Sequence, residues 1–337
     1  MRLLLGQLGP LLLVLLLGAG CGGTDASKAG AEPDRGARPT TLAGGTCWDD
    51  TQLPEALGKQ TFDAWVKKYA GGKAALAQSM RDDAAFSSPV TCSEPHALEL
   101  YGVVEVRPSL TARVKDYAQL LDQGSALYRA IRDQVNDRCL ADSTYGAAQR
   151  RAGGVPVQLG PSLNARSGLH VAWDPFPADL WEKGQKGFVC TFEQDRPGTL
   201  RFADLATSKV PAAARVCLDT PKTYLPCSGR HQAEDIGEMI LNTAIEQRKI
   251  SGRQAVRTGP RGQYVALTDA EYARLDKVCE ALLSSVSTRK GGVAARAYPG
   301  SVSQWPTSSG AYVASCFALK PDVTPLPSVS GTVFDRE

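Results

Sequence analysis

The first 20 residues are nearly all apolar, and the pattern changes abruptly after them. One positive charge, Arg2, precedes an uninterrupted apolar run from Leu11 to Leu17, and small residues then lead to Cys21. A membrane-spanning helix needs about 20 consecutive apolar residues, and Gly9 and Pro10 break this stretch well short of that length. The pattern therefore predicts a secretory signal peptide over residues 1–20.

The next segment, residues 21–44, has the opposite character. Its only large apolar residue is Leu42, and the others are mostly Gly, Ala, Pro, Thr and charged side chains. Such a composition buries too little apolar surface to offset the entropy of folding. We therefore expect a flexible linker here, followed by a folded part that begins at residue 45.

Residues 45–194 mix helical and extended patterns. Apolar residues recur at helical spacing over 62–69 and again over 114–135, where Gly124-Ser125 predicts a break and a new N-cap. Between these helical patterns, apolar residues alternate along an expected strand from His96 to Val106. A closing strand is expected over 187–192.

Residues 195–319 repeat this order in a shorter form. The nine residues between Cys217 and Cys227 suit a hairpin or tight loop, and a strand is expected after His231. Thr268 and Glu271 have the spacing of a capping box, which predicts the start of a helix. A closing strand is expected over 311–319.

One motif is written twice in the chain, as Cys92-Ser-Glu-Pro-His96-Ala-Leu-Glu99-Leu-Tyr-Gly102 and as Cys227-Ser-Gly-Arg-His231-Gln-Ala-Glu234-Asp-Ile-Gly237. The duplication predicts two homologous, disulfide-stapled domains of the α+β class, each a small sheet packed against helices. The expected ranges are 1–20 for the signal peptide, 21–44 for the linker, 45–194 and 195–319 for the two repeats, and 320–337 for a loosely held Pro-rich tail.

Cysteine usage agrees with export. Even sets of cysteines in an exported chain indicate disulfides, whereas in the cytosol the same count favours metal or redox chemistry. Four cysteines permit three pairings in each repeat, and the short loop from Cys217 to Cys227 favours bonding the first to the second. Pairing across the repeats is the alternative. The expected bridges are Cys47–Cys92, Cys139–Cys190, Cys217–Cys227 and Cys279–Cys316.

The charge balance excludes one class of partner. The chain has 38 Lys and Arg residues against 35 Asp and Glu residues. A nucleic-acid-binding protein gathers basic residues on one face or tract, and the basic clusters here are only pairs such as Arg150-Arg151. We therefore expect no nucleic-acid partner.

His96 and His231 are the sharpest chemical candidates, because each lies four residues after a cysteine and three before a glutamate. Pro95 argues against a metal-binding helix, an oxidised cysteine cannot ligate zinc as a thiolate, and a His and a Glu three apart on a strand point to opposite faces. The expectation is that each histidine hydrogen-bonds the turn beside its disulfide, with no metal or cofactor. A metal or small-ligand site at the two histidines is the alternative.

No complete catalytic set is present in the sequence. It has no Gly-x-Ser-x-Gly elbow and only three histidines, of which His170 is interpreted as an ordinary strand residue. Trp181 and Trp305 could stack on sugars, but a tryptophan at a repeated position is more often a core residue. The rival hypothesis is a cell-wall hydrolase that uses Glu99 and Glu234 as acid and base.

Two resemblances complete the picture. The segment from Leu17 to Cys21 resembles a bacterial lipoprotein box, although Gly18 departs from it, and the resemblance implies a lipid on Cys21. The pattern Gly45-Thr-Cys47-Trp, Cys92-Ser-Glu-Pro-His96-x-x-Glu99-x-x-Gly102, Cys139, Trp181-x-x-Gly184 and Cys190 resembles the septum formation domain family of actinobacterial envelope proteins. The second copy, with His231, Glu234, Gly237 and Trp305, matches less fully, because it lacks the proline.

The expected function follows from these observations. The resemblance implies a lipoprotein anchored to the outer face of the cell membrane, with a link to septum formation. Because no catalytic set is complete, we expect a non-catalytic binding or structural role. The expected partners are the membrane, through the lipid, and an envelope protein or a cell-wall polymer.

Overall fold

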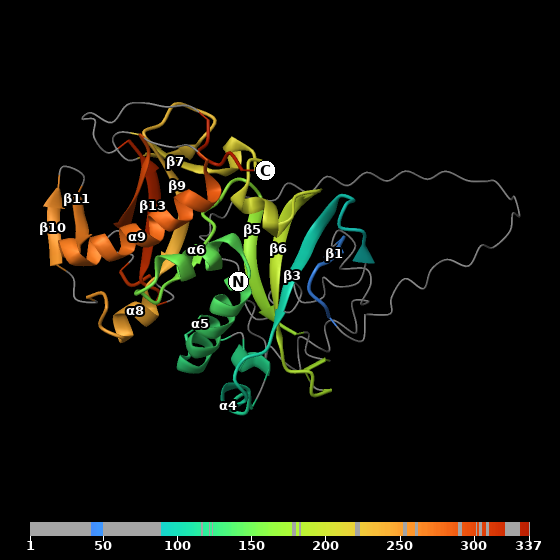
Figure 1. The fold of residues 1–337 in the computed structure, drawn as a ribbon. Coiled ribbons are helices and arrows are strands. Elements are labelled where there is room, and N and C mark those ends of the chain that lie inside the picture. Colours follow the sequence, from blue (N-terminus) through green and yellow to red (C-terminus); the bar gives the residue numbers. More distant parts are fainter. Residues whose placement is uncertain are drawn as a thin grey trace, which may run out of the picture.

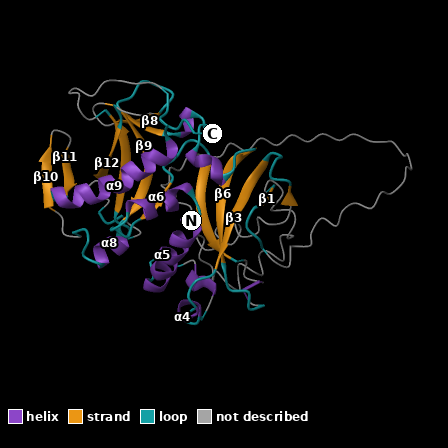
Figure 2. Ribbon diagram, viewed as in Figure 1, coloured by secondary structure: helices purple, strands orange, loops and turns teal. Residues whose placement is uncertain are grey.

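The computed structural model describes residues 42–49, 89–176, 180–219, 223–251, 255–259, 262–288, 292–320 and 331–336, apart from residues 116, 121, 123, 182, 301, 303, 304, 308 and 309. Within these residues the protein is of the α+β class, as the sequence predicted. Two antiparallel sheets lie side by side, and helices pack against them (Figures 1 and 2).

The first sheet has the strand order β2-β1-β3-β6-β5. Its centre is β3, which carries the first copy of the motif and pairs with β6 along its length. Helix α5 begins at the N-cap Ser125, whose hydroxyl accepts from the amide of Tyr128, and it ends just past Cys139. The elements are β1 (Thr46–Trp48), β2 (Pro89–Val90), β3 (His96–Val104), α4 (Pro108–Thr111), a 3-10 turn (Tyr117–Leu120), α5 (Ala126–Leu140), β5 (Leu169–Pro175) and β6 (Phe188–Gly198).

The second sheet has the order β12-β13-β9-β7-β8, and β9 carries the second copy of the motif. Thr268 and Glu271 form the predicted capping box at the start of α9. The elements are two 3-10 turns (Phe202–Ala206 and Ala212–Ala214), β7 (Val216–Asp219), β8 (Thr223–Pro226), β9 (Ala233–Ile240), α8 (Asn242–Glu246), the hairpin β10 (Ala255–Gly259) with β11 (Gly262–Ala266), α9 (Asp269–Val286), β12 (Ala294–Pro299) and β13 (Val313–Leu319).

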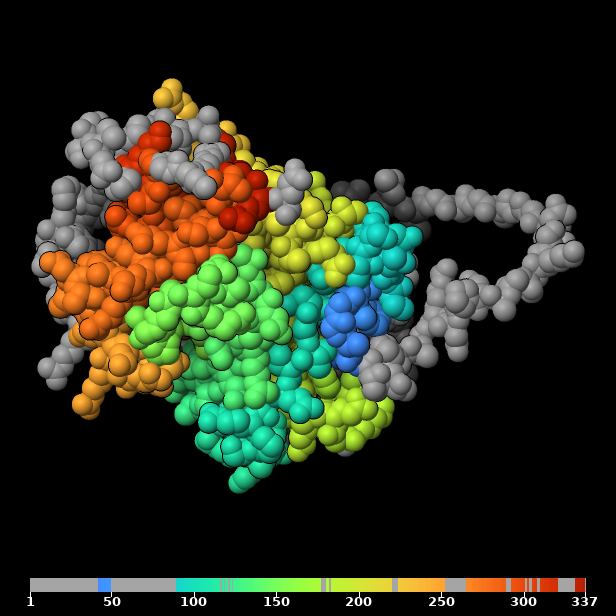
Figure 3. Space-filling model, viewed as in Figure 1, coloured from blue at the N-terminus to red at the C-terminus, as the bar shows by residue number. Residues whose placement is uncertain are grey.

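A segment from the first sequence repeat completes the second sheet. Helix α6 (Thr144–Ala152) packs on α9, and β4 (Gln158–Gly160) pairs with β9. Tyr145 and Leu159 are fully buried in the core that lies under the second sheet. Figure 3 shows this green segment against the orange surface of α9. The two units therefore share one continuous structure, although the sequence repeats suggest a boundary near residue 194.

Both ends of the folded part extend beyond the predicted limits. Leu42, which the composition places in the linker, is buried in the core of the first sheet. At the other end, Val333 and Phe334 are buried, so the expectation of a loosely held tail is wrong for residues 331–336. The physical reason is the same at both ends, since each segment supplies apolar side chains that cover an otherwise exposed core edge.

Two further expectations differ from the structure. The predicted strand to Val106 ends at Val104, and the helical pattern from residue 114 forms only the 3-10 turn at Tyr117–Leu120 before α5. The signal peptide, Cys21, the helical pattern over 62–69 and the Pro-rich stretch 321–327 lie outside the described residues. In the described part, no helix has the length and apolarity that crossing a membrane requires.

Candidate functional site

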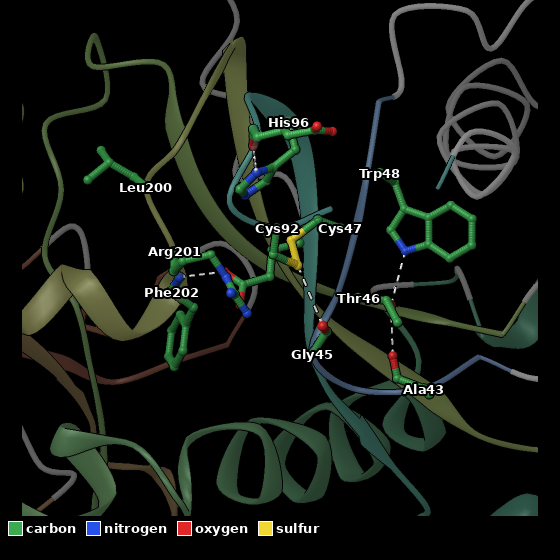
Figure 4. The surroundings of a disulfide bond; sticks show 12 residues. Ala43, Gly45, Thr46, Cys47, Trp48, Cys92, His96, Leu200, Arg201 and Phe202 are labelled. Atoms are coloured by element: carbon green, nitrogen blue, oxygen red, sulfur yellow. Dashed lines mark hydrogen bonds and ion pairs between the residues drawn. A yellow bond between two sulfur atoms is a disulfide. The ribbon is translucent and has the colours of Figure 1, made fainter. Parts of the chain in front are cut away.

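The two copies of the motif form matching structures, which we call the first corner (Cys47, Cys92, His96 and Glu99) and the second corner (Cys217, Cys227, His231 and Glu234). Each corner joins a disulfide on the strand beside a sheet's central strand to the start of that central strand. Figure 4 shows the first corner, in which Cys92 on the turn before β3 is bonded to Cys47 on β1.

All four predicted disulfides are present. The bridges of the two corners join cysteines 45 and 10 residues apart, and their Cα atoms are 5.1 and 5.0 Å apart. The remaining bridges, Cys139–Cys190 and Cys279–Cys316, fasten the long helix of each unit to its closing strand. No bridge crosses between the repeats, so the alternative pairing is excluded.

Each motif histidine hydrogen-bonds the turn beside its disulfide, as expected. The Nδ1 atom of His96 lies 2.8 Å from the carbonyl oxygen of Glu94, and Nδ1 of His231 lies 2.9 Å from the carbonyl oxygen of Gly229. Because a carbonyl only accepts, Nδ1 carries the proton and donates in both rings. In His96 the other ring nitrogen, Nε2, is buried and has no hydrogen-bond partner among the described residues.

Glu99 is buried and holds the chain that follows the closing strand. Its Oε1 atom lies 2.6 Å from a guanidinium nitrogen of Arg201, and its Oε2 accepts from the backbone amide of Phe202 at 2.6 Å. Figure 4 shows Arg201 and Phe202 beside the disulfide of this corner. The ring of Phe202 stacks on Tyr101, with centroids 3.6 Å apart. Glu99 thus fixes a segment about 100 residues away in the chain.

Glu234 does the same for the C-terminal segment, but with neutral donors. Its Oε1 accepts from the hydroxyl of Thr332 at 2.5 Å, and its Oε2 accepts from the amide of Val333 at 2.6 Å. The next residue, Phe334, lies under the buried guanidinium of Arg215, 3.6 Å from the ring centroid. Burial raises the pKa of Glu234, and these hydrogen bonds and the charge of Arg215 oppose that shift.

In the second corner, the expectation that the histidine and the glutamate point to opposite faces is wrong. The ligand atoms of Cys217, Cys227, His231 and Glu234 all lie within 4.8 Å of one another. The alternation rule fails because His231 precedes β9, which begins at Ala233, so the two side chains do not belong to one regular strand. Among the described residues this is the one group of His, Cys, Asp and Glu side chains with such spacing.

The two motif glycines are required by close packing. A Cβ atom on Gly102 would lie 3.2 Å from the sulfur of Cys190, and one on Gly237 would lie 2.7 Å from a methyl of Leu282. The contact at Gly237 is closer than a Cβ atom approaches in a packed interior, and the one at Gly102 requires the sulfur to move by a few tenths of an ångström. The glycine of each copy therefore lets the central strand lie against the helix-to-strand disulfide or the long helix of its unit.

The two tryptophans are core residues. Trp181 packs edge-on against Phe188, with centroids 5.8 Å apart, and only 8% of its surface is exposed. Trp305 is 1% exposed and packs against Tyr312. Neither ring offers a face on which a sugar could stack. His170 lies on β5 with its side chain 3.3 Å from Asp195, as an ordinary strand residue.

Sequence reasoning missed the partners of both motif glutamates and one buried acid. Arg201 and Thr332 are far from the motif in the sequence. The only sequence feature that could have identified them as partners is that each follows the closing strand of its unit. Asp235 is buried, and desolvation is the main cause that raises its pKa to about 8; the nearby Glu238 adds to this, while hydrogen bonds from Ser315, Gly237 and Ser162 lower it. The sequence feature that could have identified Asp235 is its position. It directly follows Glu234, and the matching position of the first copy holds the core residue Leu100.

The corners are organised to hold protein segments. Both oxygens of Glu99 and both oxygens of Glu234 already accept from side chains or amides of the protein itself. A general acid or base must instead reach the proton of a substrate.

A search against family models, curated proteins and solved structures finds no match to this chain.

Proposed function

We propose that the protein is an exported lipoprotein, anchored by a lipid on Cys21 to the outer face of the cell membrane, with a non-catalytic binding or structural role in the envelope. We place it with the septum formation proteins that its sequence resembles. The four disulfides support export, because such bonds persist in oxidising compartments. The leader and the small residues before Cys21 support the anchor.

One observation carries the non-catalytic role. In both corners the histidine and the glutamate, which a catalytic interpretation would need, are buried. The Nδ1 atom of each histidine and both oxygens of each glutamate bond to turns and segments of the protein itself. Such contacts stabilise a fold, since buried polar groups must be paired. The binding of an envelope protein or a cell-wall polymer would then take place on the surface of the protein, outside the corners.

The role is tested with the purified protein and isolated cell walls. We expect no release of soluble wall fragments, and no difference between the natural protein and a Glu99→Gln variant. Release of fragments that is lost in Glu99→Gln, with Glu280→Gln on the exposed face of α9 as the matched control, would establish the rival hydrolase. Crosslinking in intact cells followed by identification of the captured molecule then names the partner.

The anchor is tested separately with Cys21→Ser. We expect this variant to leave the membrane fraction and enter the medium, because the lipid on Cys21 is the proposed attachment. Ala19→Ser, two positions away, is the matched control and should remain on the membrane. Membrane retention of Cys21→Ser would contradict the anchor without affecting the binding role.

A further inference from the structure

The second corner brings together four side chains that are all metal ligands. Cys217, Cys227, His231 and Glu234 are each buried, and their ligand atoms lie within 4.8 Å of one another. A tetrahedral zinc ion with bonds of about 2.0–2.3 Å holds its ligand atoms about 3.3–3.8 Å apart. The side chains therefore lie close enough to surround one zinc ion once the two sulfurs, now bonded 2.04 Å apart, have separated.

The histidine is oriented for this role. Its Nδ1 donates to the carbonyl oxygen of Gly229 at 2.9 Å, which leaves the lone pair of Nε2 for a ligand. Zinc-binding histidines ordinarily have their second nitrogen fixed by a carbonyl or a carboxylate in this way. The hydrogen bond that supports the turn thus also sets the tautomer that a metal requires.

Glu234 keeps the capacity to bind a cation, whereas Glu99 does not. Glu99 is in direct contact with the guanidinium of Arg201, 2.6 Å away, and among the described residues the side chains of the first corner do not form a group with metal-ligand spacing. Glu234 instead accepts from the neutral hydroxyl of Thr332 and the amide of Val333. A carboxylate has about four lone-pair sites, and two of those on Glu234 remain after these bonds.

We propose that the second corner is a redox-gated zinc site, in which reduction of Cys217–Cys227 creates a binding site formed by two thiolates, the Nε2 atom of His231 and one oxygen of Glu234. The first corner has no such function. Oxidised, the second corner is a structural disulfide; reduced, the same four side chains hold Zn²⁺ and keep the β7–β8 hairpin attached to the start of β9.

The chemistry balances in two steps. A dithiol reductant gives two electrons and two protons to the disulfide, the bond between the sulfurs breaks, and the reductant leaves as its own disulfide. Zn²⁺ then forms two Zn–S bonds and displaces the two thiol protons to solvent. The site then carries one net negative charge, which the buried guanidinium of Arg215 partly balances, since its field already acts on Glu234.

The experiment uses the full mature chain, reduced with a phosphine, desalted without oxygen and titrated with Co²⁺ and then Zn²⁺. We expect one Co²⁺ per chain, with the charge-transfer absorption of two thiolates and the visible bands of tetrahedral cobalt, and displacement of Co²⁺ by Zn²⁺. The oxidised chain should show neither signal. His231→Gln and Glu234→Gln should each weaken zinc binding by about 10-fold or more.

Paired cysteine variants decide which corner is responsible. The double variant Cys217→Ser, Cys227→Ser should lose the cobalt spectrum, and Cys47→Ser, Cys92→Ser should retain it. Circular dichroism of each oxidised variant shows whether the fold is kept, and the cobalt spectrum of the Cys47, Cys92 variant remains informative if the other double variant unfolds. The proposal is overturned if the reduced chain takes up no metal, if the phosphine leaves Cys217–Cys227 intact, or if the spectrum depends on Cys47 and Cys92.

Discussion

The two corners have the same residue types, and in each the histidine and the glutamate follow the second cysteine at the same spacing, yet the buried carboxylate has different partners. In the first corner Glu99 meets the cation of Arg201 and the amide of Phe202. In the second corner Glu234 meets only neutral donors from Thr332 and Val333. The motif therefore specifies a buried acceptor, and the segment that follows each closing strand decides whether a charged or only a neutral group donates to it.

The two segments also differ in what the chain does next. The segment at Phe202 is internal and leads directly into the second unit, so the first corner ties the units together. The segment at Val333 follows the closing strand of the second unit, and it covers the edge of the second core with Phe334. The same contact thus serves as a junction in one unit and, in the other, as a clasp over the core, which we call the terminal clasp.

Removing the disulfide of each corner should lower the free energy of unfolding more than any other change, and the two losses should differ between the corners. The double change Cys47→Ser, Cys92→Ser opens a 45-residue loop, and Cys217→Ser, Cys227→Ser opens a 10-residue loop. Loop entropy predicts losses in the free energy of unfolding of about 4 and about 3 kcal/mol. Denaturant unfolding measures both values. A larger loss from the short loop would show that the second disulfide acts mainly through native contacts.

The two phenylalanines test whether the segments contribute equally. Phe334 and Phe202 are both buried, at 2% and 7% exposure. Phe334→Ala and Phe202→Ala should each lower the free energy of unfolding by about 3 kcal/mol. Limited proteolysis separates them, because Phe334→Ala should free the C-terminus for cleavage, whereas Phe202→Ala should not. Equal resistance of both variants to a carboxypeptidase would contradict the terminal clasp.

The residue after each motif glutamate should make the stability of the two units depend differently on pH. Leu100 cannot titrate, whereas the pKa of Asp235 is raised to about 8 from an ordinary value near 4. Because the folded state holds this proton more tightly than the unfolded state, Asp235 makes stability fall as pH rises between these values. Asp235→Asn should remove that slope, with a relative gain of about 2 kcal/mol from pH 6 to pH 8. Urea unfolding at several pH values measures it, and parallel profiles would refute the assignment.

Neutralising each motif glutamate should change the free energy of unfolding least, and the two losses should differ between the corners. Glu99→Gln removes the charge that pairs with Arg201, and a guanidinium cannot accept a hydrogen bond from the new amide. The free energy of unfolding should therefore fall by about 1–2 kcal/mol. Glu234→Gln should cost less than about 1 kcal/mol, because the hydroxyl of Thr332 can reverse and accept from the new amide. Thermal unfolding of the two variants compares them. Equal losses would mean that the charge of Arg201 contributes nothing.

Local signals predicted much of each unit. The capping box at Thr268 and Glu271, the N-cap at Ser125, the hairpin between Cys217 and Cys227 and the four disulfides follow from spacing and residue type, and the structure has them all. These features depend on neighbours along the chain or on the duplication itself. The same logic correctly placed Trp181 and Trp305 in the core and the histidines beside the disulfide turns.

The sequence by itself determined the class, the bridges and the corner, because each depends on a short pattern that appears twice. Only the tertiary structure decided what each glutamate binds, that α6 and β4 join the second sheet, and that residues 331–336 dock. Those facts depend on contacts between residues about 80 to 100 positions apart, such as Gly160 with Glu238 and Val333 with Glu234. No local pattern encodes such pairs, because their free energy comes from burying one surface against another after the chain has folded.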